Sequence, residues 1–99
     1  MSRFDDIRQW AMDRNLIEGG TPQAQMTKLM EEIGELAAGV ARNNVEKIGD
    51  GIGDAIVVLT ILAKQYDLPV EGCIEIAWQE IKDRKGRMID GVFVKEADL

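Results

Sequence analysis

Acidic residues recur at helical spacing in two stretches of this 99-residue sequence. In the first stretch, Glu32 and Glu35 are three residues apart, and Glu31 lies four residues before Glu35. In the second, Asp50 and Asp54 are four residues apart. Residues at these spacings share one face of a helix, where like charges repel each other. A hard divalent cation such as Mg²⁺, which prefers oxygen ligands, would relieve that repulsion. The two stretches therefore predict acidic rows that could hold a cation.

Glycine interrupts both acidic stretches. Gly34 lies between the first pair of glutamates, and Gly49, Gly51 and Gly53 alternate with the aspartates, which Glu46 extends by one turn. Glycine in a helix interior costs about 1 kcal/mol relative to alanine, and such breaks of local rules are typical of functional sites. Two plainer interpretations stay open: the acids could form solvated faces, and residues 49–54 could be a loop between two helices.

The composition excludes several classes of function. The net charge of −6 argues against nucleic acid and membrane surfaces as partners, because both are anionic. The absence of histidine excludes imidazole catalysis and di-iron sites of the Glu-x-x-His type. Cys73 is the only cysteine, so a disulfide framework is excluded. Without an apolar run of about 20 residues or a signal-peptide pattern, we expect a cytoplasmic protein.

Hydrophobic spacing predicts an all-α fold with a short C-terminal β-hairpin, in one domain spanning residues 1–99. The predicted helices cover residues 2–15, 22–42, 45–66 and 70–85. Thr21 followed by Pro22 is typical of a helix start. Asp90-Gly91 between β-prone residues predicts a hairpin over residues 88–94.

The third predicted helix carries no charge between Ala55 and Ala63. A helix that is apolar on all faces must be buried on all faces, and one short chain covers such a helix poorly. We therefore expect a homodimer or homotetramer. Trp10 and Trp78 fit a core or a subunit interface better than a base-stacking role, and Cys73 fits a small buried hydrophobic residue.

Two segments together resemble the MazG-like family of all-α nucleoside triphosphate pyrophosphohydrolases. The first is Lys28-Leu-Met-Glu-Glu-Ile-Gly-Glu-Leu36, and the second is Asp50-Gly-Ile-Gly-Asp-Ala-Ile-Val-Val-Leu59. The family signature is Glu-x-x-Glu followed, after a spacer, by Glu-x-x-Asp. Glu32, Glu35 and Asp54 match it, but Gly51 stands where the third acid belongs, and Asp50 is the obvious replacement.

The resemblance implies a four-helix MazG-like bundle completed by oligomerisation. It also implies Mg²⁺-dependent hydrolysis of (deoxy)nucleoside triphosphates to monophosphate and pyrophosphate, in a house-cleaning role for the nucleotide pool. The implied metal ligands are Glu32, Glu35, Asp50 and Asp54, and Mn²⁺ could replace Mg²⁺. A further carboxylate, either Glu31 or Glu35, would orient or deprotonate the attacking water.

Basic residues should hold the phosphate oxygens that the metal leaves free. On the fourth predicted helix, Gln79, Lys82 and Lys85 share a face, and Lys28 lies four residues before Glu32. Two alternatives stay open. One is a phosphoribosyl-ATP-type pyrophosphohydrolase, and the other is a non-catalytic helical oligomer that serves as an interaction module.

Overall fold

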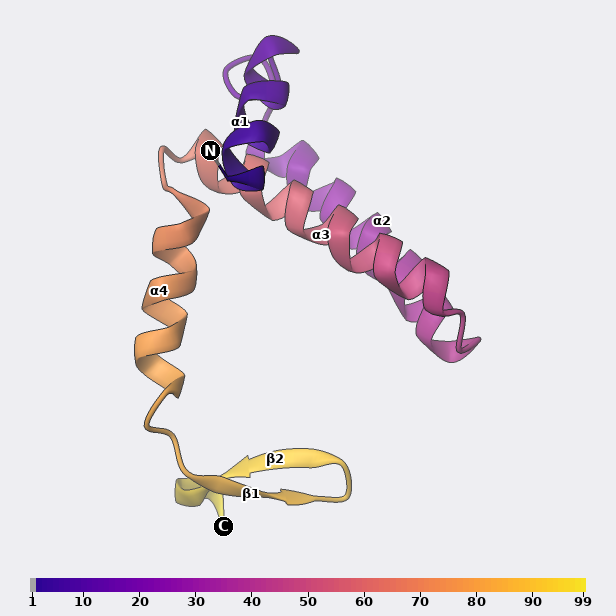
Figure 1. Ribbon diagram of the computed structural model, residues 1–99, viewed down its shortest axis with the longest axis vertical. Coiled ribbons are helices and arrows are strands. Elements are labelled where there is room, and N and C mark those ends of the chain that lie inside the picture. Colours follow the sequence, from indigo (N-terminus) through magenta and orange to yellow (C-terminus); the bar gives the residue numbers. More distant parts are fainter. Residues whose placement is uncertain (1) are drawn as a thin grey trace.

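The computed structural model of the chain describes residues 2–99, which form four α-helices and one β-hairpin (Figure 1). The helices are α1 (Arg3–Asp13), α2 (Pro22–Ala41), α3 (Val45–Gln65) and α4 (Val70–Ile81). The antiparallel strands β1 (Gly86–Ile89) and β2 (Val92–Lys95) follow, and a 3₁₀ turn, η1 (Glu96–Asp98), comes last. The predicted helical fold with a C-terminal hairpin is confirmed.

Polar side chains cap the first three helices. Ser2 accepts a hydrogen bond from the backbone N–H of Asp5 (3.2 Å), and the Asp5 carboxylate accepts one from the N–H of Ser2 (3.1 Å). Thr21 and Asn44 accept in the same way from N–H groups three residues ahead, at 3.1 and 3.3 Å. Each bond satisfies a donor that the first turn of a helix leaves free, so the starts of α1, α2 and α3 are set locally.

The glycine-rich segment 49–53 is helical and belongs to α3, so the alternative of a loop is wrong. Helices α2 and α3 run side by side in opposite directions (Figure 1). Leu29 from α2 packs with Ala55 and Val58 from α3 to form a small buried core. Gly51 is buried because it faces Leu36 across this helix pair. The pairing places the two acidic rows on neighbouring helices.

Gly49→Ala is expected to raise the free energy of unfolding by about 1 kcal/mol, because alanine restricts the unfolded chain and favours the helix. A Cβ atom at position 49 would meet nothing within 4 Å. Urea denaturation at a fixed protein concentration measures the change. A lower free energy of unfolding would contradict the open space at this position.

Two predicted helix ends are wrong. The first helix ends at Asp13 rather than Asn15, because Asn15 adopts a left-handed conformation (φ 57°). The fourth ends at Ile81 rather than Lys85. The carbonyl of Lys85 accepts a hydrogen bond from the N–H of Glu96 (2.8 Å), which draws Lys85 to the base of the hairpin. Lys85 therefore shares no helix face with Gln79, whereas Lys82 caps the end of the helix, where its N–H donates to the carbonyl of Trp78 (2.9 Å).

The hairpin itself turns where predicted. Asp90 and Gly91 both have positive φ, 50° and 80°, and Ile89 pairs with Val92 across the turn. Positive φ at both central positions is the pattern of a type I′ turn, which suits the twist of a two-residue hairpin.

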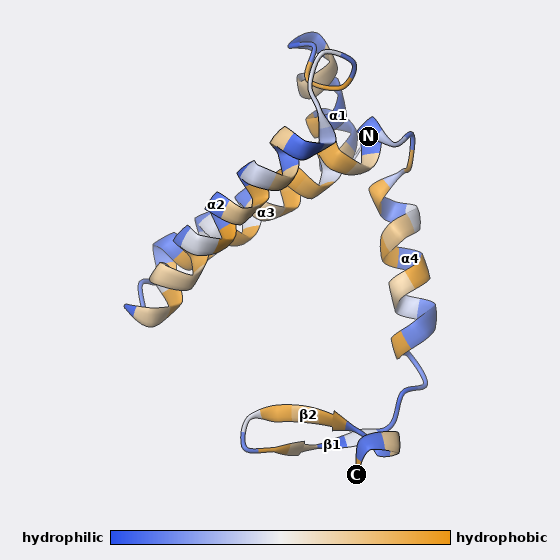
Figure 2. Cartoon of the chain, turned by 180° about the vertical axis from the view of Figure 1, so that it is seen from behind, coloured by the Kyte–Doolittle hydropathy of each residue, from blue (hydrophilic) through white to orange (hydrophobic). Residues whose placement is uncertain are grey.

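The apolar half of α3 is buried on one side only. Ile56 and Leu59 are each 42% exposed, while Val58 is 5% exposed. Trp10 and Trp78 are about half exposed, so a place in the core of the single chain is wrong for both. Cys73 is half-buried rather than buried. In Figure 2, hydrophobic residues recur along α3, α4 and the strands of the hairpin.

An ion-pair cluster connects α1 to the start of α4. The Arg8 guanidinium donates to both carboxylate oxygens of Glu71 (2.7 and 2.8 Å) and to Asp5 (2.6 Å). The Arg8 side chain is only 14% exposed. Hydrogen bonds from Arg8 lower the pKa of Glu71, and together with those from Ser2 they lower the pKa of Asp5 to about 2. This Arg8 cluster fixes the direction in which α4 leaves the bundle.

Glu71→Gln is expected to reduce stability at neutral pH and to have no effect in strong acid. A carboxyl group with a lowered pKa stabilises the fold above its unfolded pKa of about 4.3, and this contribution is lost as the pH falls through the folded value. Thermal melts of wild type and variant should therefore converge between about pH 4 and pH 2. Glu80→Gln on the same exposed helix is the control. Equal stability of wild type and Glu71→Gln at pH 7 would contradict the role of the cluster.

Candidate functional site

The acidic rows of α2 and α3 meet at a cavity of about 350 Å³. Glu35 and Ala38 line it from α2, and Lys47, Asp50, Gly51 and Asp54 line it from α3. Three of the four predicted metal ligands therefore share one cavity. Because Ala38 and Gly51 are small, the space between the carboxylates stays unfilled.

The fourth predicted ligand, Glu32, lies one turn away and is buried, with 6% exposure. One carboxylate oxygen, Oε1, is 3.1 Å from Nζ of Lys28. The other, Oε2, is buried and has no hydrogen-bond partner. Leaving a buried carboxylate oxygen without a hydrogen-bond donor costs free energy, and native proteins rarely do so without a functional reason.

The carboxyl group of Asp54 lies in surroundings that disfavour its charged form. Its pKa is raised, first because it is partly removed from water, and then because the charges of Asp50 and Glu32 lie nearby. A partly buried carboxyl crowded by two others is the arrangement that a cation would relieve.

The other sequence-predicted residues lie around or away from the cavity. Glu31 is exposed and is not among the lining residues, whereas Glu35 is. Lys28 pairs with Glu32, and this pair raises the pKa of Lys28. Gln79 donates to Glu75 (2.7 Å). The structure does not bring α4 to the cavity: α4 and the hairpin extend away from the α2–α3 pair (Figure 1). Within one chain, Gln79, Lys82 and Lys85 are therefore not part of the site.

Lys47 is the charged residue of this cavity that the sequence interpretation missed. It lies three residues before Asp50 and seven before Asp54, so all three share one face of α3. This spacing was readable in the sequence. A cation among these carboxylates can offset part of their repulsion and can attract a phosphate.

The carboxylate oxygens of these residues are the type of ligand that a hard metal ion prefers, but they lie too far apart to bind one together. Within residues 2–99, no three acidic or cysteine side chains lie close enough together to hold an ion as they stand. The unpartnered Oε2 of Glu32 and the crowded carboxyl of Asp54 nevertheless fit a cation chemically. Glu35 and Asp50 are exposed at the edge of this group.

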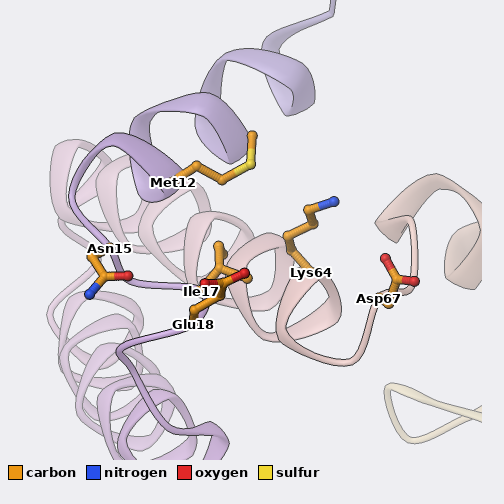
Figure 3. A pocket seen from close by; sticks show the side chains of 6 residues that line it. All are labelled: Met12, Asn15, Ile17, Glu18, Lys64 and Asp67. Atoms are coloured by element: carbon orange, nitrogen blue, oxygen red, sulfur yellow. The ribbon is translucent and has the colours of Figure 1, made fainter.

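A second cavity, of about 430 Å³, lies at the other end of α3 (Figure 3). Its lining includes Met12, Asn15, Glu18, Lys64 and Asp67. Lys64 is ten residues beyond Asp54, or about 15 Å along the helix. Each cavity is lined by one lysine, but the second has two acids and the first has three, so the first cavity is the better candidate for a cation site.

No helix within residues 2–99 combines the length and the apolar character that crossing a bilayer requires. The fold and the first cavity together define an α-helical protein with an acidic site on an antiparallel helix pair. Residues 20–87 match the MazG nucleotide pyrophosphohydrolase domain, which is well over half of the chain. The chain belongs to this family.

A relative from Haemophilus phage HP1, an uncharacterized 18.2 kDa protein in the rep-hol intergenic region, is 62% identical over 60 residues. The aligned part is 61% of this chain and 37% of the phage protein, so the chain spans little more than a third of that relative. No solved structure matches this chain.

Proposed function

We propose that the chain is a Mg²⁺-dependent pyrophosphohydrolase that cleaves (deoxy)nucleoside triphosphates to monophosphate and pyrophosphate in nucleotide-pool house-cleaning. The observation that carries this proposal is the cavity in which Glu35, Asp50 and Asp54 meet Lys47, beside the unpartnered oxygen of Glu32. Membership of the MazG family supports the reaction type.

Glu32, Glu35, Asp50 and Asp54 would hold the metal, and Mn²⁺ could replace Mg²⁺. When bound, the ion would neutralise phosphate charge and lower the pKa of a coordinated water. Glu32 is buried and Asp54 is half-buried, so these two would fix the position of the ion. Glu35 and Asp50 are exposed at the rim and would turn inward as the substrate arrives.

A carboxylate at the cavity would also orient the attacking water or take its proton. Glu35 is the better of the two candidates because it lines the cavity, whereas Glu31 does not. Lys47 would hold phosphate oxygens from the opposite wall. A triphosphate that approaches an acidic protein needs such positive charge, because the net charge of −6 repels it.

The test is pyrophosphate release from each NTP and dNTP with Mg²⁺ or Mn²⁺, and with EDTA as the metal-free control. Phosphoribosyl-ATP belongs in the same panel, since turnover of that compound alone would replace the substrate class but keep the chemistry. Release that stops with EDTA is the expected result. A folded protein that releases no pyrophosphate from any compound would overturn the proposal and favour a non-catalytic interaction module.

A further inference from the structure

Lys28 is the only basic residue of α2, and it lies about one turn before the three glutamates of that helix. Its Nζ is 3.1 Å from Oε1 of Glu32, whereas Oε2 of the same carboxylate is buried and has no hydrogen-bond partner. The Glu32 side chain is 8% exposed and the Lys28 side chain is 54% exposed. One oxygen of this buried carboxylate is therefore neutralised by a half-exposed lysine, and the other is left for a different ligand.

The Lys28–Glu32 ion pair is less firmly held than the pair between Arg8 and Glu71. The Arg8 side chain is 14% exposed and donates two hydrogen bonds to Glu71 and one to Asp5. Lys28 reaches Glu32 from a side chain that lies largely in water. It also precedes Glu32 by four residues, and a helical pair in which lysine precedes glutamate is less favourable than the reverse order. Another cation could therefore replace Lys28 at little cost in free energy.

Glu32 requires a positive charge beside it, because a buried carboxylate without a counter-ion is strongly disfavoured. Among the ion pairs within residues 2–99, only the one with Lys28 involves Glu32. Lys28 therefore supplies that charge in the metal-free protein. Its ammonium would be repelled by a divalent cation at Oε2, since like charges interact strongly at a site removed from water.

We propose that Lys28 is a resident counter-ion of the acidic site: it neutralises Glu32 in the metal-free protein and gives way to a divalent cation, which frees its ammonium for a phosphate of the substrate. One side chain thereby links metal binding to phosphate binding. Lysine suits this exchange because its ammonium is a compact charge on a flexible stem. The inference rests on the proposed function, since it takes the metal site from there.

Calorimetric titration with Mn²⁺ alone, without nucleotide, tests the exchange. Lys28→Met should bind Mn²⁺ about tenfold more tightly than wild type, because the competing positive charge is gone. Lys28→Arg keeps that charge and should bind within about threefold of wild type. Lys64→Met is the control for the loss of a lysine, because Lys64 lines the other cavity, and its affinity should equal that of wild type.

Thermal melts give a readout that an ordinary surface ion pair would not produce. In EDTA, Lys28→Met should melt below wild type, because Glu32 loses its counter-ion. In saturating Mn²⁺ the two proteins should melt at the same temperature, because tighter binding to the folded variant offsets that loss. A gap that stays the same in EDTA and in Mn²⁺ would mean that Lys28 and the metal do not replace each other.

The link to phosphate is tested with the Mg²⁺ complex of a non-hydrolysable ATP analogue. Lys28→Met should bind this complex more weakly than wild type, because the freed ammonium is missing. Equal binding would overturn this part of the proposal.

A Mn²⁺ affinity that is unchanged or lower in Lys28→Met would overturn the exchange. The proposed metal site would still stand after that result, because wild type binds Mn²⁺ in the same experiment. A folded wild-type protein that binds no Mn²⁺ would instead overturn the metal site itself, and the exchange with it.

Discussion

Asp54→Asn is expected to lower the rate of pyrophosphate release by about 100-fold or more and, at the same time, to stabilise the metal-free protein. The first effect follows because the variant removes one charged oxygen donor from the proposed metal site, where even supporting residues contribute 10- to 100-fold. The second follows because partial burial and the nearby charges of Asp50 and Glu32 raise the pKa of Asp54. Relief of like-charge contacts contributes a few tenths of a kcal/mol each.

Activity and stability should therefore move in opposite directions. In EDTA, the melting temperature of Asp54→Asn should exceed that of wild type by about 2–4 °C. Added Mg²⁺ should raise the melting temperature of wild type, because a ligand that binds the folded state stabilises it, and should raise that of the variant much less. Pyrophosphate assays and thermal melts of the same preparations measure both effects.

Asp67→Asn is the matched control for Asp54→Asn. Asp67 is exposed beyond the far end of α3, and its left-handed backbone (φ 56°) suits asparagine equally well. Its activity and its response to Mg²⁺ should equal those of wild type. If Asp54→Asn kept full activity, or if it melted below wild type in EDTA, the carboxylates would not form a strained site that awaits a cation.

Most of the fold is predictable because local signals and helical periodicity agree. Ser2, Thr21 and Asn44 begin helices through their own side chains, and Asp90-Gly91 defines the hairpin turn. The continuous helix through Gly49 and Gly53 is harder to predict, because packing against α2 overrides the low helix propensity of glycine there. The end of α4 is not predictable from periodicity, because the hydrogen bond from Glu96 to Lys85 arises only once the hairpin forms.

The site is predictable as far as spacing on a helix determines it. Asp50 and Asp54 share a face, and the antiparallel pairing with α2 brings Glu35 to the same cavity. Spacing cannot separate Glu31 from Glu35, since both fall near that face, and only the packed helix pair selects Glu35. Periodicity likewise identifies Trp78 as part of an apolar face without saying what covers it.

Gly51→Glu, which would restore the acid of the family signature, is expected to lower the free energy of unfolding by about 1–3 kcal/mol. A Cβ atom at position 51 would lie 3.1 Å from Cβ of Leu36 and 3.3 Å from its Cα. The backbone atom cannot move without separating α2 from α3, so overpacking outweighs the gain in helix propensity of up to about 1 kcal/mol. Because the added side chain would point into the helix contact, it should not supply a working metal ligand.

Asp50→Glu is the paired variant, since it lengthens the neighbouring carboxylate that is exposed and already lines the cavity. It should leave stability within about 0.5 kcal/mol of wild type and keep activity within a few-fold, because one added methylene can be accommodated in open space. Urea denaturation and pyrophosphate assays of the two variants at equal protein concentration make the comparison.

If Gly51→Glu were as stable as wild type and more active, the close contact with Leu36 would not determine the geometry of the site. Asp50 would then not be the acid that replaces the missing glutamate. If Gly51→Glu is instead less stable and no more active, the close packing at position 51 and the carboxylate at position 50 depend on each other. The glycine then brings α2 and α3 close enough for the shorter side chain of Asp50 to reach the cavity.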